Sequence, residues 1–131
     1  IADLRRNHVK MAVVTSSNDR KMAAVYRARP EVRTMFDRIL TAEMFSRSKP
    51  APDCFLLGME VFGTTPGNTY VFEDSFNGLK AGMASEATVI GLATTNSREA
   101  IAPLCYCVLD DFTGFTYDKL WLDIFQTTLV K

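Results

Sequence analysis

The stretch that decides the fold is "VFEDSFNGLKAGMASEATVIGL", from Val71 to Leu92. An apolar run ends abruptly at two adjacent carboxylates, Glu73 and Asp74, and a helix-like segment and a second apolar run follow. Acidic residues placed where a buried strand stops either cap the next helix or hold a cation. A strand, a helix and a second strand in succession are typical of a parallel α/β sheet.

The rest of the chain repeats this alternation of apolar runs and segments with helical periodicity. Ser17 or Asn18 can cap the second helix, Pro30 stops it, and Gly63 closes a later one. The strands do not alternate between apolar and polar residues, which indicates that both faces of the sheet are covered. The patterns predict strands at residues 9–17, 39–41, 69–74, 88–94 and 104–110, and helices at residues 19–29, 52–63, 76–85, 97–102 and 116–129.

The first six residues, "IADLRR", are typical of the last turns of a helix, with Asn7 as its left-handed stop. A helix that begins at residue 1 lacks its own start, so we expect the chain to be part of something longer. Within residues 1–131 we expect a single domain, since the pattern contains no repeat, low-complexity segment or linker.

Composition excludes several classes of partner. Of the 131 residues, 47% are hydrophobic and 23% are charged, and fifteen basic residues balance fifteen acidic ones. This balance argues against nucleic acid or an acidic membrane surface as a partner. No apolar run approaches the ~20 residues that span a bilayer, and the N-terminal residues have no signal-peptide core. We therefore expect a cytoplasmic protein that binds neither nucleic acid nor membrane.

The few cysteines and the single histidine limit the available chemistry. Cys105 and Cys107 lie two apart, where a strand would place both on one face, and their spacing matches neither a redox pair nor a zinc site. Together with Cys54 they are predicted to be buried free thiols. His8 precedes the first strand and is expected to face solvent. The sequence thus argues against histidine acid–base chemistry, and any metal site has to be built from oxygen ligands.

Polar residues gather where the strands end, and ligands of open parallel sheets bind outside the carboxyl ends of the strands. Lys49 lies in a polar, proline-rich segment before a helix, and Glu73 and Asp74 follow their own strand. The first strand runs into four polar residues, which are Thr15, Ser16, Ser17 and Asn18.

These groups have complementary chemistry. Hydroxyls, backbone N–H groups at a helix start and an ammonium suit a phosphate dianion. Adjacent carboxylates suit a hard cation, Mg²⁺ before Zn²⁺. Each group also has an ordinary explanation, since Thr15–Asn18 and Glu73–Asp74 can cap helices and Lys49 can lie on the surface. Their order along the chain favours a site for phosphoryl transfer.

The combined motifs "MAVVTSSN", "SKPAPDCF" and "VFEDSFNGLKAG" resemble the haloacid dehalogenase-like (HAD) superfamily, in the branch of phosphatases and phosphomutases related to β-phosphoglucomutase. The resemblance covers almost the whole chain and implies a Rossmann-like parallel sheet with helices on both faces. It implies a Mg²⁺-dependent enzyme acting on a small phosphorylated metabolite. The implied roles are phosphate binding by Thr15, Ser16, Ser17, Asn18 and Lys49, catalysis by Thr15 and Lys49, metal binding by Asp74 and Glu73, and shaping of the adjacent loop by Ser75 and Asn77.

One departure from the family concerns mechanism. The first family motif, DxDx[TV], supplies the aspartate nucleophile, and no stretch of the 131 residues matches it. Asp110 and Asp111 are adjacent, which is the wrong spacing. By analogy the missing strand lies between the strand ending at Thr15 and the strand ending at Glu73. We therefore expect a sheet incomplete at its N-terminus and a chain that is inactive alone, completed by the missing N-terminal segment or a second copy.

Other classes of protein remain as alternatives. The main one is a non-catalytic, truncated module that binds a phosphorylated ligand or a partner chain. A phospho-receiver domain places its acidic pair first and its lysine last, which is the reverse of the order here. A dinucleotide-binding fold requires a G-x-G-x-x-G stretch after a strand, and Gly78 and Gly82 do not form one.

Overall fold

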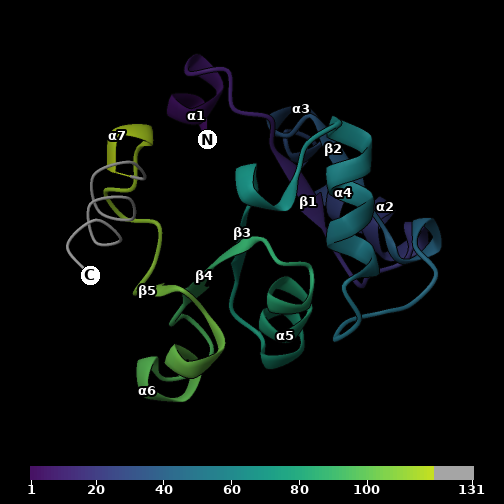
Figure 1. The fold of residues 1–131 in the computed structure, drawn as a ribbon. Helices are drawn as coiled ribbons and strands as arrows, with labels where there is room; N and C mark the ends of the chain where they lie inside the picture. The colour runs from purple at the N-terminus through teal and green to yellow at the C-terminus, as the bar shows by residue number, and fades with distance from the viewer. Residues whose placement is uncertain (120–131) are drawn as a thin grey trace.

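The computed structural model describes residues 1–119 and contains short parallel strands with helices packed around them (Figure 1). The strands are β1 (Ala12–Val14), β2 (Arg38–Leu40), β3 (Tyr70–Glu73), β4 (Thr88–Leu92) and β5 (Cys107–Leu109). The α-helices are α1 (Ala2–Arg6), α2 (Asp19–Ala28), α3 (Val32–Met35), α4 (Asp53–Phe62), α5 (Phe76–Ala84), α6 (Arg98–Ile101) and α7 (Tyr117–Lys119). Short 3₁₀ turns occupy Ala42–Met44, Pro66–Asn68 and Ala102–Leu104.

The strands form two sheets and not one. β1 pairs with β2 in parallel, with Val13 opposite Ile39. β4 lies between β3 and β5, also in parallel, with Phe72 opposite Ile90. Within residues 1–119, β1 and β3 do not pair. The predicted parallel α/β fold is confirmed, and the sheet is interrupted where the resemblance places the absent strand.

The main core lies between the three-stranded sheet and the helices α4, α5 and α6. Leu79, Val89 and Ile101 are fully buried in it. Helix α5 approaches the sheet closely at Gly82, where a β-carbon would come within 2.8 Å of Val89 Cγ2. A glycine is therefore needed for this helix and sheet to pack.

The opposite face of the same sheet is covered by aromatic side chains. Ile90 is fully buried there. The Phe72 ring lies 5.4 Å from the ring of Phe112 and 5.4 Å from that of Phe115. The segment after β5 thus covers the second face on its way to α7, as a doubly covered sheet requires.

Local signals set most of the helix ends. Asn18 caps α2, with its side chain accepting a hydrogen bond from the Lys21 N–H at 2.8 Å. Helix α4 ends at Gly63, whose φ of 63° is left-handed. Ser75 caps α5 in the same way as Asn18 caps α2. The ends at Asn18 and Gly63 agree with the sequence patterns because caps depend on residues within one helical turn, whereas the cap of α5 is Ser75 and not Glu73 or Asp74.

The end of the first helix and some of the short elements differ from the sequence predictions. Asn7 has a φ of −93°, and the left-handed residue is His8, with a φ of 60°. His8 is exposed, as expected. Helix α3 and the turn at residues 42–44 were not predicted. The predicted helix at residues 116–129 is described only as far as Lys119, and its remainder lies outside the described residues.

The prediction of three buried, free cysteine thiols is confirmed only in part. All three are free, and Cys54 is fully buried. Cys105 and Cys107 are only half-buried. They do not share a face, because β5 begins only at Cys107, so Cys105 packs against the main core and Cys107 against Ile90. In the part of the chain that the structure describes, no helix is long and apolar enough to cross a membrane.

Candidate functional site

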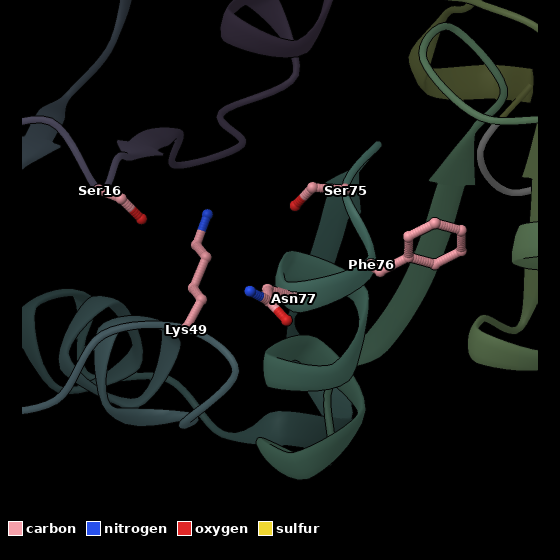
Figure 2. A pocket seen from close by; sticks show the side chains of 5 residues that line it. All are labelled: Ser16, Lys49, Ser75, Phe76 and Asn77. Atoms are coloured by element: carbon pink, nitrogen blue, oxygen red, sulfur yellow. The ribbon is translucent and has the colours of Figure 1, made fainter.

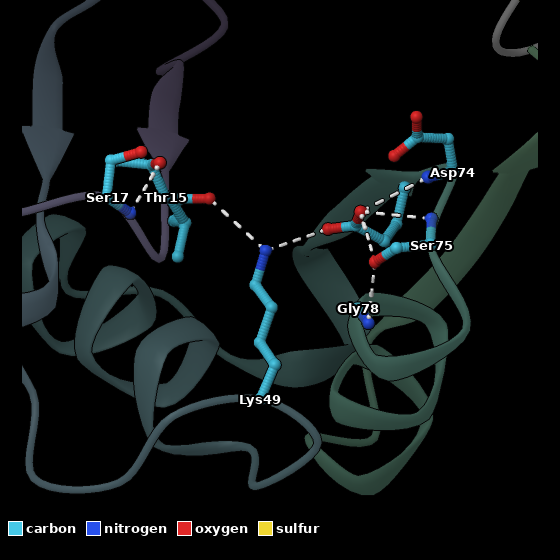
Figure 3. A network of polar contacts seen from close by, with 8 residues as sticks. Thr15, Ser17, Lys49, Asp74, Ser75 and Gly78 are labelled. Atoms are coloured by element: carbon cyan, nitrogen blue, oxygen red, sulfur yellow. Dashed lines mark hydrogen bonds and ion pairs between the residues drawn. The ribbon is translucent and has the colours of Figure 1, made fainter. Parts of the chain in front are cut away.

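Lys49 lies between the carboxyl ends of β1 and β3 (Figure 3). Its ammonium donates to Oε2 of Glu73 at 2.9 Å and to the carbonyl oxygen of Val14 at 3.3 Å. It also lies 5.2 Å from the centre of the Phe55 ring, within the range of a cation–π contact. The side chain is only 11% exposed. Lys49 is therefore a positioned, largely buried cation and not an ordinary surface lysine.

The loop that carries Lys49 is closed by a second ion pair. Nε and one terminal nitrogen of Arg47 donate to the two carboxylate oxygens of Asp53, at 3.2 and 2.8 Å. These bonds from Arg47 hold the pKa of Asp53 below its ordinary value. Asp53 begins α4, so the pair attaches the loop to that helix. The Lys49–Pro50 peptide bond within the loop is cis.

Glu73 organises the turn between β3 and α5. Its Oε1 accepts hydrogen bonds from the Asp74 N–H at 3.2 Å, the Ser75 N–H at 3.3 Å and the Ser75 hydroxyl at 3.1 Å. A β-carbon at Gly78 would overlap the Glu73 side chain, so the helix passes the carboxylate only because residue 78 is glycine. Both oxygens of Glu73 are thus engaged, one by the turn and one by Lys49.

Asp74 is held by a different part of the chain. Its Oδ2 accepts a hydrogen bond of 2.6 Å from the Thr95 hydroxyl, and its backbone carbonyl accepts one of 3.1 Å from the Asn96 side chain. The bond from Thr95 is the main cause of a lowered Asp74 pKa, which partial burial opposes. The two adjacent carboxylates therefore have different main partners, Lys49 for Glu73 and Thr95 for Asp74, although Glu73 and Lys49 also help to lower the pKa of Asp74.

The polar run after β1 divides between the site and the next helix. The Thr15 hydroxyl accepts a hydrogen bond of 3.1 Å from the Ser17 N–H, and Asn18 caps α2. The capping explanation therefore holds for Asn18, whereas Ser16 faces the cavity. Lys49 contacts the carbonyl of Val14, the residue directly before Thr15, which brings the motifs "MAVVTSSN" and "SKPAPDCF" together.

A cavity of about 490 Å³ opens beside Lys49 (Figure 2). It is lined by Ser16, Lys49, Ser75, Phe76 and Asn77. The Phe76 ring points away from the other labelled side chains in Figure 2, and Phe76 is 42% exposed. Lys49, Ser16 and Asn77 offer one ammonium, one hydroxyl and one amide, whereas the hydroxyl proton of Ser75 is already donated to Glu73. A phosphate group is the kind of ligand that such donors bind.

The donor set of the acidic pair fits a hard cation only in part. Carboxylate oxygens with no histidine or cysteine beside them match Mg²⁺. Residues 1–119 contain no group of three or more histidine, cysteine, aspartate or glutamate side chains able to hold a metal ion. With both Glu73 oxygens engaged, Asp74 is the member of the pair better placed for a metal. A full ligand shell would need waters or other groups, as is common for Mg²⁺.

Sequence reasoning missed Thr95 and Asn96. Both lie in "TTNS", the polar run that follows β4. The rule that ligands bind at the carboxyl ends of parallel strands could have found them, since it applies to β4 as it does to β1 and β3.

The amino-acid sequence is similar to a known protein family and to several characterised proteins. The sequence profile of the haloacid dehalogenase-like hydrolase family matches residues 1–86. The β-phosphoglucomutase of Mycobacterium bovis is 38% identical over 96 residues, which are 72% of this chain and 37% of that protein. Hexitol phosphatase A of Escherichia coli is 32% identical over 94 residues, which are 70% of this chain and 42% of that protein. The chain thus spans less than half the length of these relatives.

The fold matches as well. The crystal structure of CbbY from Rhodobacter sphaeroides in complex with phosphate has a TM-score of 0.75 and 27% identity, with 86% of this chain and 51% of that one covered. Together with the family profile and the β-phosphoglucomutase relative, this structural similarity identifies the family of the chain. The chain belongs to the haloacid dehalogenase-like hydrolase superfamily, in its β-phosphoglucomutase-like branch.

Proposed function

We propose that this chain supplies the phosphate-binding site and part of the Mg²⁺ site of a phosphomonoester phosphatase or phosphosugar mutase acting on a small phosphorylated metabolite. The observation that carries the proposal is the position of Lys49, a largely buried ammonium beside a cavity lined by hydroxyl and amide groups. A relative named as a β-phosphoglucomutase, another named as a hexitol phosphatase and a structural neighbour that binds phosphate support it.

In this proposal each side chain has a defined task. Lys49 neutralises the oxygens of the phosphate, and Glu73 keeps the ammonium oriented through their ion pair. Ser16 and the hydroxyl of Thr15 add donors from the end of β1, with Ser17 and Asn18 closer to the rest of the substrate. Asp74 holds Mg²⁺, which when bound would offset charge on the phosphate.

The source of the nucleophile is a separate question. The 131 residues contain no DxDx[TV] motif. Asp110 accepts a hydrogen bond of 2.8 Å from Arg98, Asp111 accepts one of 2.7 Å from the Thr113 N–H, and both are exposed. Neither lines the cavity beside Lys49. We therefore propose that the chain alone does not turn over phosphomonoesters and that the nucleophile comes from another segment.

The second candidate function is a non-catalytic module that binds a phosphorylated ligand. The same two observations favour it, namely a formed cationic cavity and the absence of the nucleophile motif from the sequence. A cytoplasmic location is part of both proposals, supported by three free cysteines.

Phosphate binding and turnover, measured on the purified chain, test the two candidates together. Inorganic phosphate binding, followed by calorimetry, is expected in the wild-type chain and lost in Lys49→Met, while Lys80→Met, a change of an exposed lysine on α5, binds normally. An aryl phosphate with Mg²⁺ is expected to show no hydrolysis. Equal phosphate binding by Lys49→Met would contradict the assigned site. Hydrolysis that Asp74→Asn abolishes would show that the chain contains a nucleophile and is an enzyme by itself.

A further inference from the structure

We propose that Thr95 and Asn96, in the turn after β4, are positioning residues that orient Asp74 for binding a divalent cation. The inference rests on the proposed function and extends it to two residues outside all of the recognised motifs. Its basis is the pair of hydrogen bonds that join this turn to Asp74.

The two contacts hold Asp74 at two different points. The Thr95 hydroxyl donates to the carboxylate at 2.6 Å, a length typical of a charge-assisted bond between a hydroxyl and an ionised carboxylate. The Asn96 amide donates to the backbone carbonyl of the same residue at 3.1 Å. One bond limits rotation of the side chain, and the other fixes the backbone that carries it.

The sheet explains why residues 21 positions apart in sequence can meet. β3 and β4 are parallel neighbours, with Glu73 directly opposite Gly91. The turns that follow the two strands therefore leave the sheet side by side. Leu92 ends β4, and the Ala93 N–H still bonds to the Leu109 carbonyl at 2.9 Å, so the turn starts from a fixed position.

The arrangement suits a metal ligand better than a simple helix cap. A carboxylate has about four lone-pair positions, and the bond from Thr95 uses one of them. The Ser75 side chain, and not Asp74, caps the N-terminus of α5. Glu73 is occupied by Lys49 and the turn. The bond from Thr95 thus orients the Asp74 carboxylate and leaves it lone pairs that can bind a metal ion. Hydrogen-bond partners of metal-binding carboxylates act in this way.

The opposite expectation follows if the bond only closes the turn. In that case Thr95 would compete with a cation for Oδ2. Removing the hydroxyl would then leave metal affinity unchanged or would increase it. The sign of the effect on affinity therefore separates positioning from a purely structural contact.

Mn²⁺, a probe for Mg²⁺ sites, allows a direct measurement of binding by electron paramagnetic resonance without any activity assay. Thr95→Val is expected to weaken Mn²⁺ binding about tenfold, the lower end of the effect of losing such a partner. Thr95→Ser keeps the hydroxyl and is expected to bind within about twofold of wild type. Thr94→Val, a change at the exposed threonine next to it, serves as the matched control and is expected to have no effect.

A second readout locates the metal. Bound Mn²⁺ is expected to broaden the side-chain amide signal of Asn96 in nuclear magnetic resonance spectra of the wild-type chain and not of Asp74→Asn. Affinity in Thr95→Val equal to or tighter than wild type would overturn the positioning role while leaving Asp74 as a ligand. Mn²⁺ binding that Asp74→Asn does not weaken, or no measurable Mn²⁺ binding by the wild-type chain, would overturn the positioning role and the proposed metal site together. Neither result affects the phosphate site at Lys49, which the calorimetric experiment tests separately.

Discussion

The ammonium of Lys49 lies 2.9 Å from Oε2 of Glu73 and 3.3 Å from the carbonyl oxygen of Val14. One side chain therefore connects the ends of β1 and β3, two strands that do not pair with each other within the described residues. Lys49 and Glu73 are only 11% and 12% exposed, so their charges depend on each other. The predictions that follow begin with this pair.

Removing one partner of the ion pair is expected to destabilise the chain. Lys49→Met leaves Glu73 as a largely buried charge without its cation, and the expected loss in the free energy of unfolding is about 3 kcal/mol. Glu73→Gln is expected to cost a similar amount for the reciprocal reason. Because the two residues are in contact, the double variant should lose less than the sum of the single losses. Urea unfolding measures all three, and simple additivity of the losses would argue against a coupled pair.

Gly78→Ala is expected to destabilise the protein although alanine favours helices. The new β-carbon would overlap the Glu73 side chain, and such crowding costs about 1–3 kcal/mol. Gly58→Ala in α4 is the matched control, since its β-carbon would lie 3.8 Å from Leu40, an ordinary contact. That change is expected to stabilise by about 0.5–1 kcal/mol. Opposite signs for the two substitutions in thermal unfolding are the expected result, and a stabilising Gly78→Ala would contradict the close approach.

Cys54 is expected to make stability fall at alkaline pH. Burial raises the pKa of its thiol above the ordinary value of 9.0. Above that value the unfolded chain loses the proton while the folded chain keeps it, so folding becomes less favourable as pH rises through the folded pKa. Urea unfolding between pH 7 and 10.5 should show a fall that begins near pH 9. Cys54→Ala should remove part of this fall, although it lowers stability at pH 7. An unchanged slope would show that Cys105 or tyrosines cause it.

The interrupted sheet is expected to take up a further strand. The facing edges, β1 in "MAVV" and β3 in "TYVF", are apolar and contain neither charge nor proline that would protect them. Direct pairing of the two does not occur in this structure. We expect an additional segment to fill the gap, in preference to a second copy of the chain. Size-exclusion chromatography of the protein as isolated from its source, followed by mass spectrometry, should give an assembly heavier than the 14.6 kDa of these 131 residues. A clean monomer of that mass would contradict the prediction.

Much of the architecture followed from the sequence because its signals are local. The alternation of apolar runs and helical periodicity identified the strands β1 to β5 and the longer helices. Asn18 and Gly63 lie at helix ends for reasons contained within a few neighbouring residues. Helix α3 was not predicted because four residues are too few to show a helical period.

The position of the candidate site at the carboxyl ends of the strands could also be predicted from the sequence. The hydrogen bonds between the side chains of the site could not. The rule for parallel sheets brought Lys49 and the acidic pair to one edge. That Glu73 pairs with Lys49, 24 positions away, and that Thr95 holds Asp74, 21 positions away, depended on which strands lie side by side. Neither pair has a sequence signature, because hydrogen bonds between distant residues are set by the register of β3 on β4 and by the loop that carries Lys49. Sequence periodicity determines which face of an element is buried, and only the packed chain determines which side chains meet at its end.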